Sequence, residues 1–98
     1  MNYYPFHLGD YATHTSHIEP LEDLAYRRML DLYYLGELQL PADPTEVARL
    51  IRMRANVGEV ESVLREFFIL TDIGWLSERC EAEISRMREK QAKAKSSA

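Results

Sequence analysis

The hydrophobic and polar positions of residues 19–37 predict one long, largely buried helix. At 100° per residue, the apolar side chains of this stretch cover more than half of the helix circumference. They are Leu21, Leu24, Ala25, Tyr26, Met29, Leu30, Leu32, Tyr33 and Leu35. The polar remainder is a narrow stripe of Asp23, Arg27 and Asp31, spaced so that opposite charges face each other. Because a surface helix has a broad polar face instead, we expect this helix to lie at the centre of one small domain.

The residues before this helix are rich in aromatic side chains. Pro5 disfavours a helical conformation at the residue before it, so residues 3–6 are predicted to be extended. Gly9 and Asp10 indicate a turn, and residues 13–17 a loop or a single helical turn. The aromatic side chains are expected to cover the central helix; the alternative is a platform on which nucleic-acid bases stack.

Two further helices are predicted after the central one. Residues 38–40 alternate apolar and polar side chains and favour a short strand. Asp43 and Pro44 then form a start signal for a helix that buries Val47, Ala48 and Ile51. Asn56 begins a second capping box. The apolar stripe of the helix that follows is Val57, Val60, Leu64 and Phe67.

The last part of the chain predicts a β-hairpin and a final helix. Residues 68–71 and 75–77 have strand character and flank a short loop that contains Gly74. Ser77 is suited to cap the last helix. That helix has a thin apolar seam, and its helicity is expected to fade beyond Met87. The seam consists of Cys80, Ile84, Met87, Gln91 and Ala94.

This order of elements predicts a mainly α fold with a small β-hairpin. It is the order of a winged-helix domain, a helix-turn-helix variant whose hairpin forms the wing, followed here by a C-terminal helix. We assign residues 1–85 to a single winged-helix-like domain. Residues 86–98 form a basic helical extension that ends without a capping signal, as a truncated or frayed helix would.

Composition narrows the functional classes. The chain has 98 residues, and no apolar run approaches the roughly 18 residues that span a bilayer, so no membrane contact is expected. The N-terminus has no signal-peptide pattern. A single cysteine, Cys80, excludes an intrachain disulfide and suits the reducing cytoplasm.

Charge is distributed unevenly along the chain. The net charge is −4, but residues 86–98 hold five basic residues and one acidic residue, which leaves −8 on the first 85 residues. An acidic body repels phosphate, so nucleic-acid binding requires a local basic surface. The candidate contacts are Arg49, Arg52, Arg54, Arg86, Arg88, Lys90 and Lys93. In a winged helix the third helix would read the major groove, but its polar face here is acidic and poorly suited to that role.

The sequence contains no catalytic constellation, and we expect neither an enzyme nor a cofactor. It has no glycine-rich phosphate loop, and Cys80 lies on an apolar seam where a structural thiol is expected. His7, His14 and His17 match no compact zinc spacing, so metal binding is a minor hypothesis.

Arg28 falls on the apolar arc of the central helix. Either the methylene groups of Arg28 extend its guanidinium to water, or the guanidinium pairs with a carboxylate. The remaining alternative is that Arg28 contacts a ligand or a partner.

A set of short segments extends over nearly the whole chain: MNYYPFHLGDY, AYRRMLDLYY, LPAD, VARLIR, VLREFF and GWLSERC. In this order they resemble the YdaU-type family, a domain of unknown function common in phages and prophages. The resemblance implies a winged-helix-like fold and an association with phage DNA replication, and it brings no catalytic residues. Ala25 and His14 depart from residues common among relatives, and His14 argues mildly against a shared function at that position.

Two hypotheses follow. The first is a non-enzymatic, DNA-associated module of a phage or prophage replication protein, with DNA and replication proteins as partners. The alternative is a protein-interaction or oligomerisation module without direct nucleic-acid contact, which would self-associate through the C-terminal helix.

Overall fold

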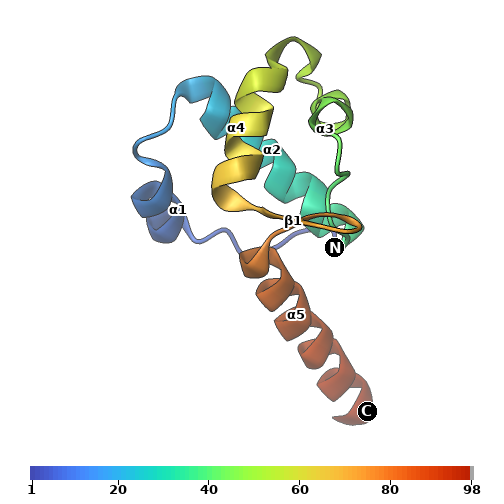
Figure 1. Cartoon of the computed structure of the whole chain (residues 1–98). Helices are drawn as coiled ribbons and strands as arrows, with labels where there is room; N and C mark the ends of the chain where they lie inside the picture. Colours follow the sequence, from blue (N-terminus) through green and yellow to red (C-terminus); the bar gives the residue numbers. More distant parts are fainter. Residues whose placement is uncertain (98) are drawn as a thin grey trace.

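The computed structural model describes residues 1–97 and confirms a mainly helical fold with one hairpin and a C-terminal helix (Figure 1). Its elements are α1 (Leu8–Thr15), α2 (Pro20–Gly36), α3 (Pro44–Leu50), the 3-10 helix η1 (Arg54–Asn56), α4 (Val57–Phe67), β1 (Ile69–Thr71), β2 (Gly74–Leu76) and α5 (Glu78–Ser97). The last residue of the predicted extension, Ala98, lies outside the described residues. No helix among residues 1–97 has both the length and the apolar character needed to cross a membrane.

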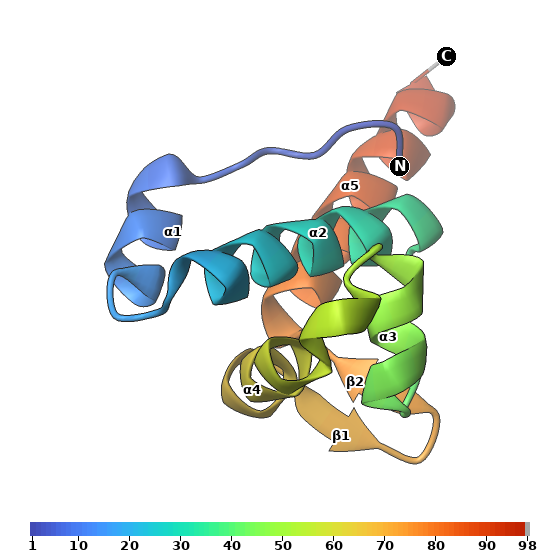
Figure 2. The same cartoon turned by 90° about the horizontal axis from the view of Figure 1, so that it is seen from above.

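Helix α2 occupies the centre of the fold, as predicted, and packs against α4 and α5 (Figure 2). Its N-terminus has a capping box in which Glu19 and Glu22 bond each other's backbone N–H groups. Ala25, Met29 and Tyr33 are fully buried. The prediction of burial around most of the helix is wrong for Leu21, Leu24 and Leu35, which are 38–66% exposed. The neighbouring elements leave one side of α2 open to solvent.

Helices α3 and α4 pack against each other beside α2. The Asp43 carboxylate accepts a hydrogen bond from the Thr45 N–H at 2.9 Å, which confirms the predicted start of α3. The predicted capping box at Asn56 is wrong: its side chain makes no capping bond, and η1 leads directly into α4. Val60 and Leu64 are buried as predicted, and the stripe also includes buried Val63.

The guanidinium of the half-buried Arg28 binds backbone carbonyls and not the carboxylate that was one of the expected alternatives. Its Nη1 donates to the carbonyl oxygen of Ile51 at 3.0 Å and to that of Arg52 at 3.4 Å. These carbonyls follow the last turn of α3, where a helix leaves acceptors unsatisfied and favours a cation. Arg28 therefore ties α2 to the end of α3.

The hairpin is antiparallel, with Leu70 opposite Trp75 and Thr71 opposite Gly74. The predicted strand at residues 38–40 is reduced to one β-bridge, in which Leu40 and Trp75 exchange backbone hydrogen bonds of 3.0 and 2.8 Å. Gly74 has a φ of 143°, a region that only glycine adopts readily. The order of helix, bridge, two helices and hairpin is compatible with a winged helix.

The N-terminal segment differs from the prediction. Residues 8–15 form α1, whereas a turn and a loop were expected, because Tyr11 and Thr15 are buried on one face of a helix. The Tyr11 hydroxyl donates to the Asp23 carboxylate. Residues 3–6 are non-helical, and Tyr4 stacks on Tyr34 with ring centroids 4.0 Å apart. Tyr4 and Tyr11 thus cover α2 as predicted, whereas Tyr3 is 80% exposed and does not.

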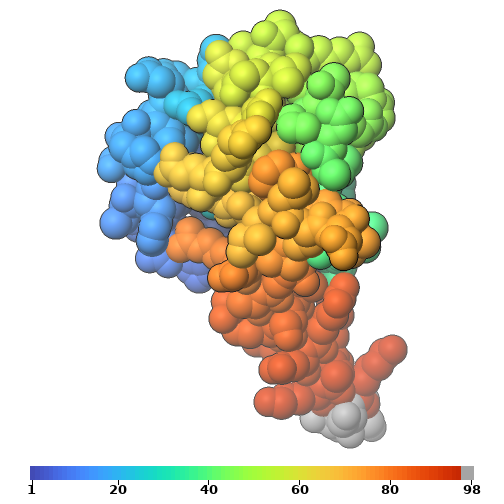
Figure 3. Space-filling view, in the orientation of Figure 1, coloured from blue at the N-terminus to red at the C-terminus, as the bar shows by residue number. Residues whose placement is uncertain are grey.

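Helix α5 begins in the core and then leaves it (Figure 3). The Ser77 hydroxyl accepts a hydrogen bond from the Cys80 N–H at 3.1 Å, as its predicted capping role requires. Cys80 and Ile84 are buried, and the helix continues through the predicted extension to Ser97, although its helicity was expected to fade beyond Met87. This projection makes the molecule elongated, with extents of 49 × 30 × 21 Å.

Candidate nucleic-acid interface

The predicted contacts Arg86, Arg88, Lys90 and Lys93 lie on the part of α5 that projects from the body (Figure 1). All four are exposed, and Glu89 is the one acidic residue between positions 86 and 95. Acidic residues occupy the first turn of α5 and a basic residue its last turn. This arrangement complements the helix dipole and favours the helix where the core no longer supports it.

The ion pairs of Arg86 and Arg88 with residues of the same chain are defined by the structure. Arg86 pairs with the buried Glu83, which raises the pKa of the Arg86 guanidinium. Arg88 Nη2 lies 3.1 Å from a carboxylate oxygen of Glu37. Both arginine side chains are more than 60% exposed, so these pairs are weak, and each guanidinium keeps further N–H donors for a phosphate.

The other predicted contacts, Arg49, Arg52 and Arg54, lie at the end of α3 and the start of η1. All three are exposed, and Arg49 pairs with Glu46 at 2.5 Å. Figures 1 and 2 place α3 and η1 well away from the basic end of α5. The predicted residues therefore form two separate surfaces, which we call the α3 arginine surface and the α5 basic face.

The surface that a winged helix would present to DNA is acidic here, as the sequence indicated. On α4, Glu61 pairs with Arg65 at 2.5 Å, and Glu66 lies 2.5 Å from His17. The hairpin contains Asp72 and no basic residue, and its apolar Ile73 is 77% exposed. Neither element offers phosphates an uncompensated cation.

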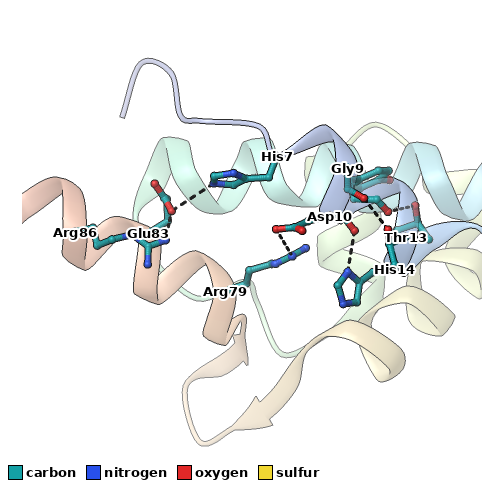
Figure 4. A network of polar contacts seen from close by, with 10 residues as sticks. His7, Gly9, Asp10, Thr13, His14, Arg79, Glu83 and Arg86 are labelled. Atoms are coloured by element: carbon teal, nitrogen blue, oxygen red, sulfur yellow. Dashed lines mark hydrogen bonds and ion pairs between the residues drawn. The ribbon is translucent and has the colours of Figure 1, made fainter.

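A cavity of about 210 Å³ lies where the N-terminal arm, α1 and α2 meet α5. Its aromatic lining comes from Tyr4, Phe6, Tyr11 and Tyr34. Polar residues complete the lining, and Figure 4 shows most of them: Asp10 lies 3.5 Å from Arg79, and His7 lies 3.9 Å from Glu83. The desolvation of Tyr4, Tyr11 and Tyr34 raises the pKa of each hydroxyl, so all three are neutral at pH 7.

Sequence reasoning did not single out Arg79 and Glu83. Their partners across the cavity, Asp10 and His7, are about 70 residues away in the sequence, and no local periodicity reports such a pairing. The useful signal was the density of aromatic residues at the N-terminus, which had suggested a stacking platform as the alternative to core covering.

The histidines are not brought together. His7 lies near Glu83, the His14 Nδ1 lies 2.8 Å from the carbonyl oxygen of Asp10, and His17 lies near Glu66. Within the described part of the chain, no group of three metal-ligating residues forms. The side chains of His7 and His17 are 61% and 55% exposed. Burial raises the pKa of the Cys80 thiol, which makes a reactive thiolate unfavourable.

Comparison with known proteins gives one match. No curated protein matches the chain, and no solved structure does. A family model described as "Protein of unknown function (DUF1376)" matches residues 2–85, which include every helix and strand up to the first two turns of α5. The basic residues from Arg86 onward lie outside the match. Because the match extends over most of the 98 residues, the chain belongs to the DUF1376 family of proteins of unknown function.

Proposed function

We propose that this chain is a non-enzymatic, DNA-associated module of a phage or prophage replication protein that acts in the cytoplasm. The observation that carries the proposal is the α5 basic face, a projecting helix whose residues 86–95 hold five basic residues and one acidic residue. Cations in such a row contact phosphates without reading bases, so the proposed binding does not depend on sequence. The replication role and the replication proteins as partners rest on the resemblance to the YdaU-type family.

The geometry favours the α5 basic face over the other surfaces. Ten helical residues extend about 15 Å, and charges in physiological salt are screened over about 8 Å. The far end of α5 is therefore largely screened from the acidic body. The α3 arginine surface has no such separation, and Glu46 neutralises part of it.

The test is the fluorescence anisotropy of labelled 20-nucleotide DNA, single-stranded and duplex, at several salt concentrations. If three to five phosphates are neutralised, a plot of log K against log salt has a slope of about −3 to −4.5 for the duplex. No binding of either DNA at 20 mM salt would refute the proposal.

Matched variants locate the contact. Lys90→Gln/Lys93→Gln and Arg49→Gln/Arg54→Gln remove the same net charge from the two surfaces. The α5 pair is expected to weaken binding about tenfold or more and to reduce the slope by about 2, whereas the α3 pair changes binding much less. The reverse order would assign the contact to the α3 arginine surface.

Self-association through the C-terminal helix is the second candidate. Cys80 and Ile84, which suggested a free apolar seam, are buried in the chain's own core. Only Met87, Gln91 and Ala94 remain for another copy, and two of these offer little apolar surface. Light scattering at high protein concentration tests this candidate: a dimer would support it, and a strict monomer would count against it.

A further inference from the structure

The aromatic-lined cavity and the α5 basic face are parts of one continuous surface. Glu83 and Arg86 line the cavity of about 210 Å³. The same two residues line a shallow groove along α5, whose other side chains are Met87, Glu89, Lys90 and Lys93. Arg86 is thus the junction between a pocket with aromatic walls and a row of cations.

From this junction we infer that the chain binds single-stranded nucleic acid, with one base in the cavity and the adjoining phosphates on Arg86, Lys90 and Lys93. The inference rests on the proposed function and names its ligand class. Sites for single strands combine aromatic side chains that stack on bases with a basic groove that follows the backbone. Both parts are present here, and they meet at Arg86.

The size and shape of the cavity suit one flat group. It is smaller than the roughly 300–1,000 Å³ of ordinary ligand pockets, so it does not accommodate a whole nucleoside triphosphate. Phe6 is 40% exposed and lines the cavity, with its ring 5.2 Å from that of Tyr11. A base held in a duplex cannot enter such a pocket without being extruded, whereas an unpaired base can.

The charges of the cavity also suit a base better than a phosphate. Asp10 is balanced by Arg79, and Glu83 by Arg86 (Figure 4). The four groups contribute no net charge, so the cavity does not attract a phosphate dianion. Its carboxylates accept hydrogen bonds, as the exocyclic amino groups of bases require. The basic side chains of Lys90 and Lys93 lie outside the cavity, in the groove along α5 where the backbone would run.

The rest of the molecule supports the single strand over the duplex. The exposed face of α4 is occupied by Glu61, Arg65 and Glu66 in pairs within the chain, and the hairpin carries no cation. The elements that would enter a major groove are thus unfavourable for DNA. The α5 basic face and the cavity need no groove.

The test compares labelled oligo-dT, oligo-U and a duplex of equal length by anisotropy at one salt concentration. The wild-type protein is expected to bind at least one single strand at least fivefold more tightly than the duplex. Phe6→Leu keeps an apolar side chain but removes the stacking ring, and it is expected to weaken single-strand binding at least fivefold with little effect on the duplex.

Tyr3→Leu is the matched control, since Tyr3 is on the same arm, is 80% exposed and does not line the cavity. It should leave both affinities within about twofold. Phe6→Trp, which retains a stacking ring, should restore the preference, and circular dichroism confirms that each variant is folded. Equal binding of duplex and single strands, or an equal loss in Phe6→Leu and Tyr3→Leu, would overturn this inference and leave the proposed function intact. No binding of any of the three ligands would refute both.

Discussion

The joint between α2 and α5 can be tested by removing one hydroxyl group. Tyr33 is fully buried in α2, and its hydroxyl donates to a carboxylate oxygen of Glu81 at 2.5 Å. The hydroxyl oxygen of Tyr33 in turn accepts a hydrogen bond of 3.3 Å from the buried N–H of Ser77, the residue that caps α5. Tyr33→Phe keeps the ring and removes both bonds, so it measures how firmly α5 is seated on α2.

The expected loss of stability is about 1.5–3 kcal/mol. A hydrogen bond to a charged acceptor contributes roughly 1.5–3 kcal/mol, and the exposure of Glu81 places it near the lower end. The N–H of Ser77 loses an acceptor, which costs roughly 1 kcal/mol more for a long bond. In a chain of this size the melting temperature should fall by roughly 6–20 °C.

Urea denaturation followed by circular dichroism gives the free energy of unfolding. Tyr3→Phe is the control, because Tyr3 is 80% exposed and its variant should stay within about 0.5 kcal/mol of the wild type. A loss below about 0.5 kcal/mol in Tyr33→Phe would show that the joint does not depend on this hydroxyl.

Three further predictions concern the body of the fold. Gly74→Ala places a Cβ against the facing carbonyl oxygen of Leu40 at a φ of 143°, so it should lower the free energy of unfolding by at least about 2 kcal/mol. Gly58→Ala, in the open first turn of α4, is the control and should be neutral or stabilising. Equal melting temperatures of the two variants would contradict this prediction. Because burial raises the pKa of the Cys80 thiol, the folded state binds the thiol proton more tightly than the unfolded state does. The free energy of unfolding should therefore fall as pH rises above about 8.5. Iodoacetamide should also react at least roughly tenfold more slowly with the native protein than with the urea-unfolded protein. Arg28→Met removes the donor to the carbonyls at the end of α3 and should lower the free energy of unfolding, measured with urea, by about 1 kcal/mol. Arg65→Met removes only an exposed ion pair and should lower it by less than about 0.5 kcal/mol. Similar losses in the two variants would argue against the capping role of Arg28.

Local signals in the sequence were sufficient for most of the fold. The proline and the acidic residues at the start of α2, the Asp43 cap of α3 and the Ser77 cap of α5 act within one helical turn, and each is found where it was predicted. The hairpin followed from a short loop between two runs of strand residues. Such signals are readable because the partners are close together in the chain.

Apart from the capping box at Asn56, which is a local signal, the errors concern contacts between distant segments. Gly9 and Asp10 indicated a turn, but burial of Tyr11 against α2 makes residues 8–15 helical. Leu24 is apolar yet 38% exposed, because periodicity does not report which side of a helix its neighbours leave open. Arg28 looked anomalous for the same reason, since its acceptors are the carbonyls at the end of another helix.

The candidate site was only partly accessible from the sequence. The basic residues from Arg86 to Lys93 were evident from charge alone, but the weak seam beyond Met87 indicated fading helicity and not the helix that carries them to Ser97. The cavity was not predicted, because it forms where the arm meets α5 and depends on Arg79 and Glu83. Whether the α3 arginine surface contributes to binding stays a prediction.

The central claim is that nucleic acid contacts the α5 basic face and the adjoining cavity. Its most direct test is a titration of ¹⁵N-labelled protein with oligo-dT, monitored through the backbone amide signals in NMR spectra. The largest shifts are expected on residues 86–95 and on the arm around Phe6, with small changes on α4 and the hairpin. Shifts centred on α4 and the hairpin, or on the α3 arginine surface, would contradict it.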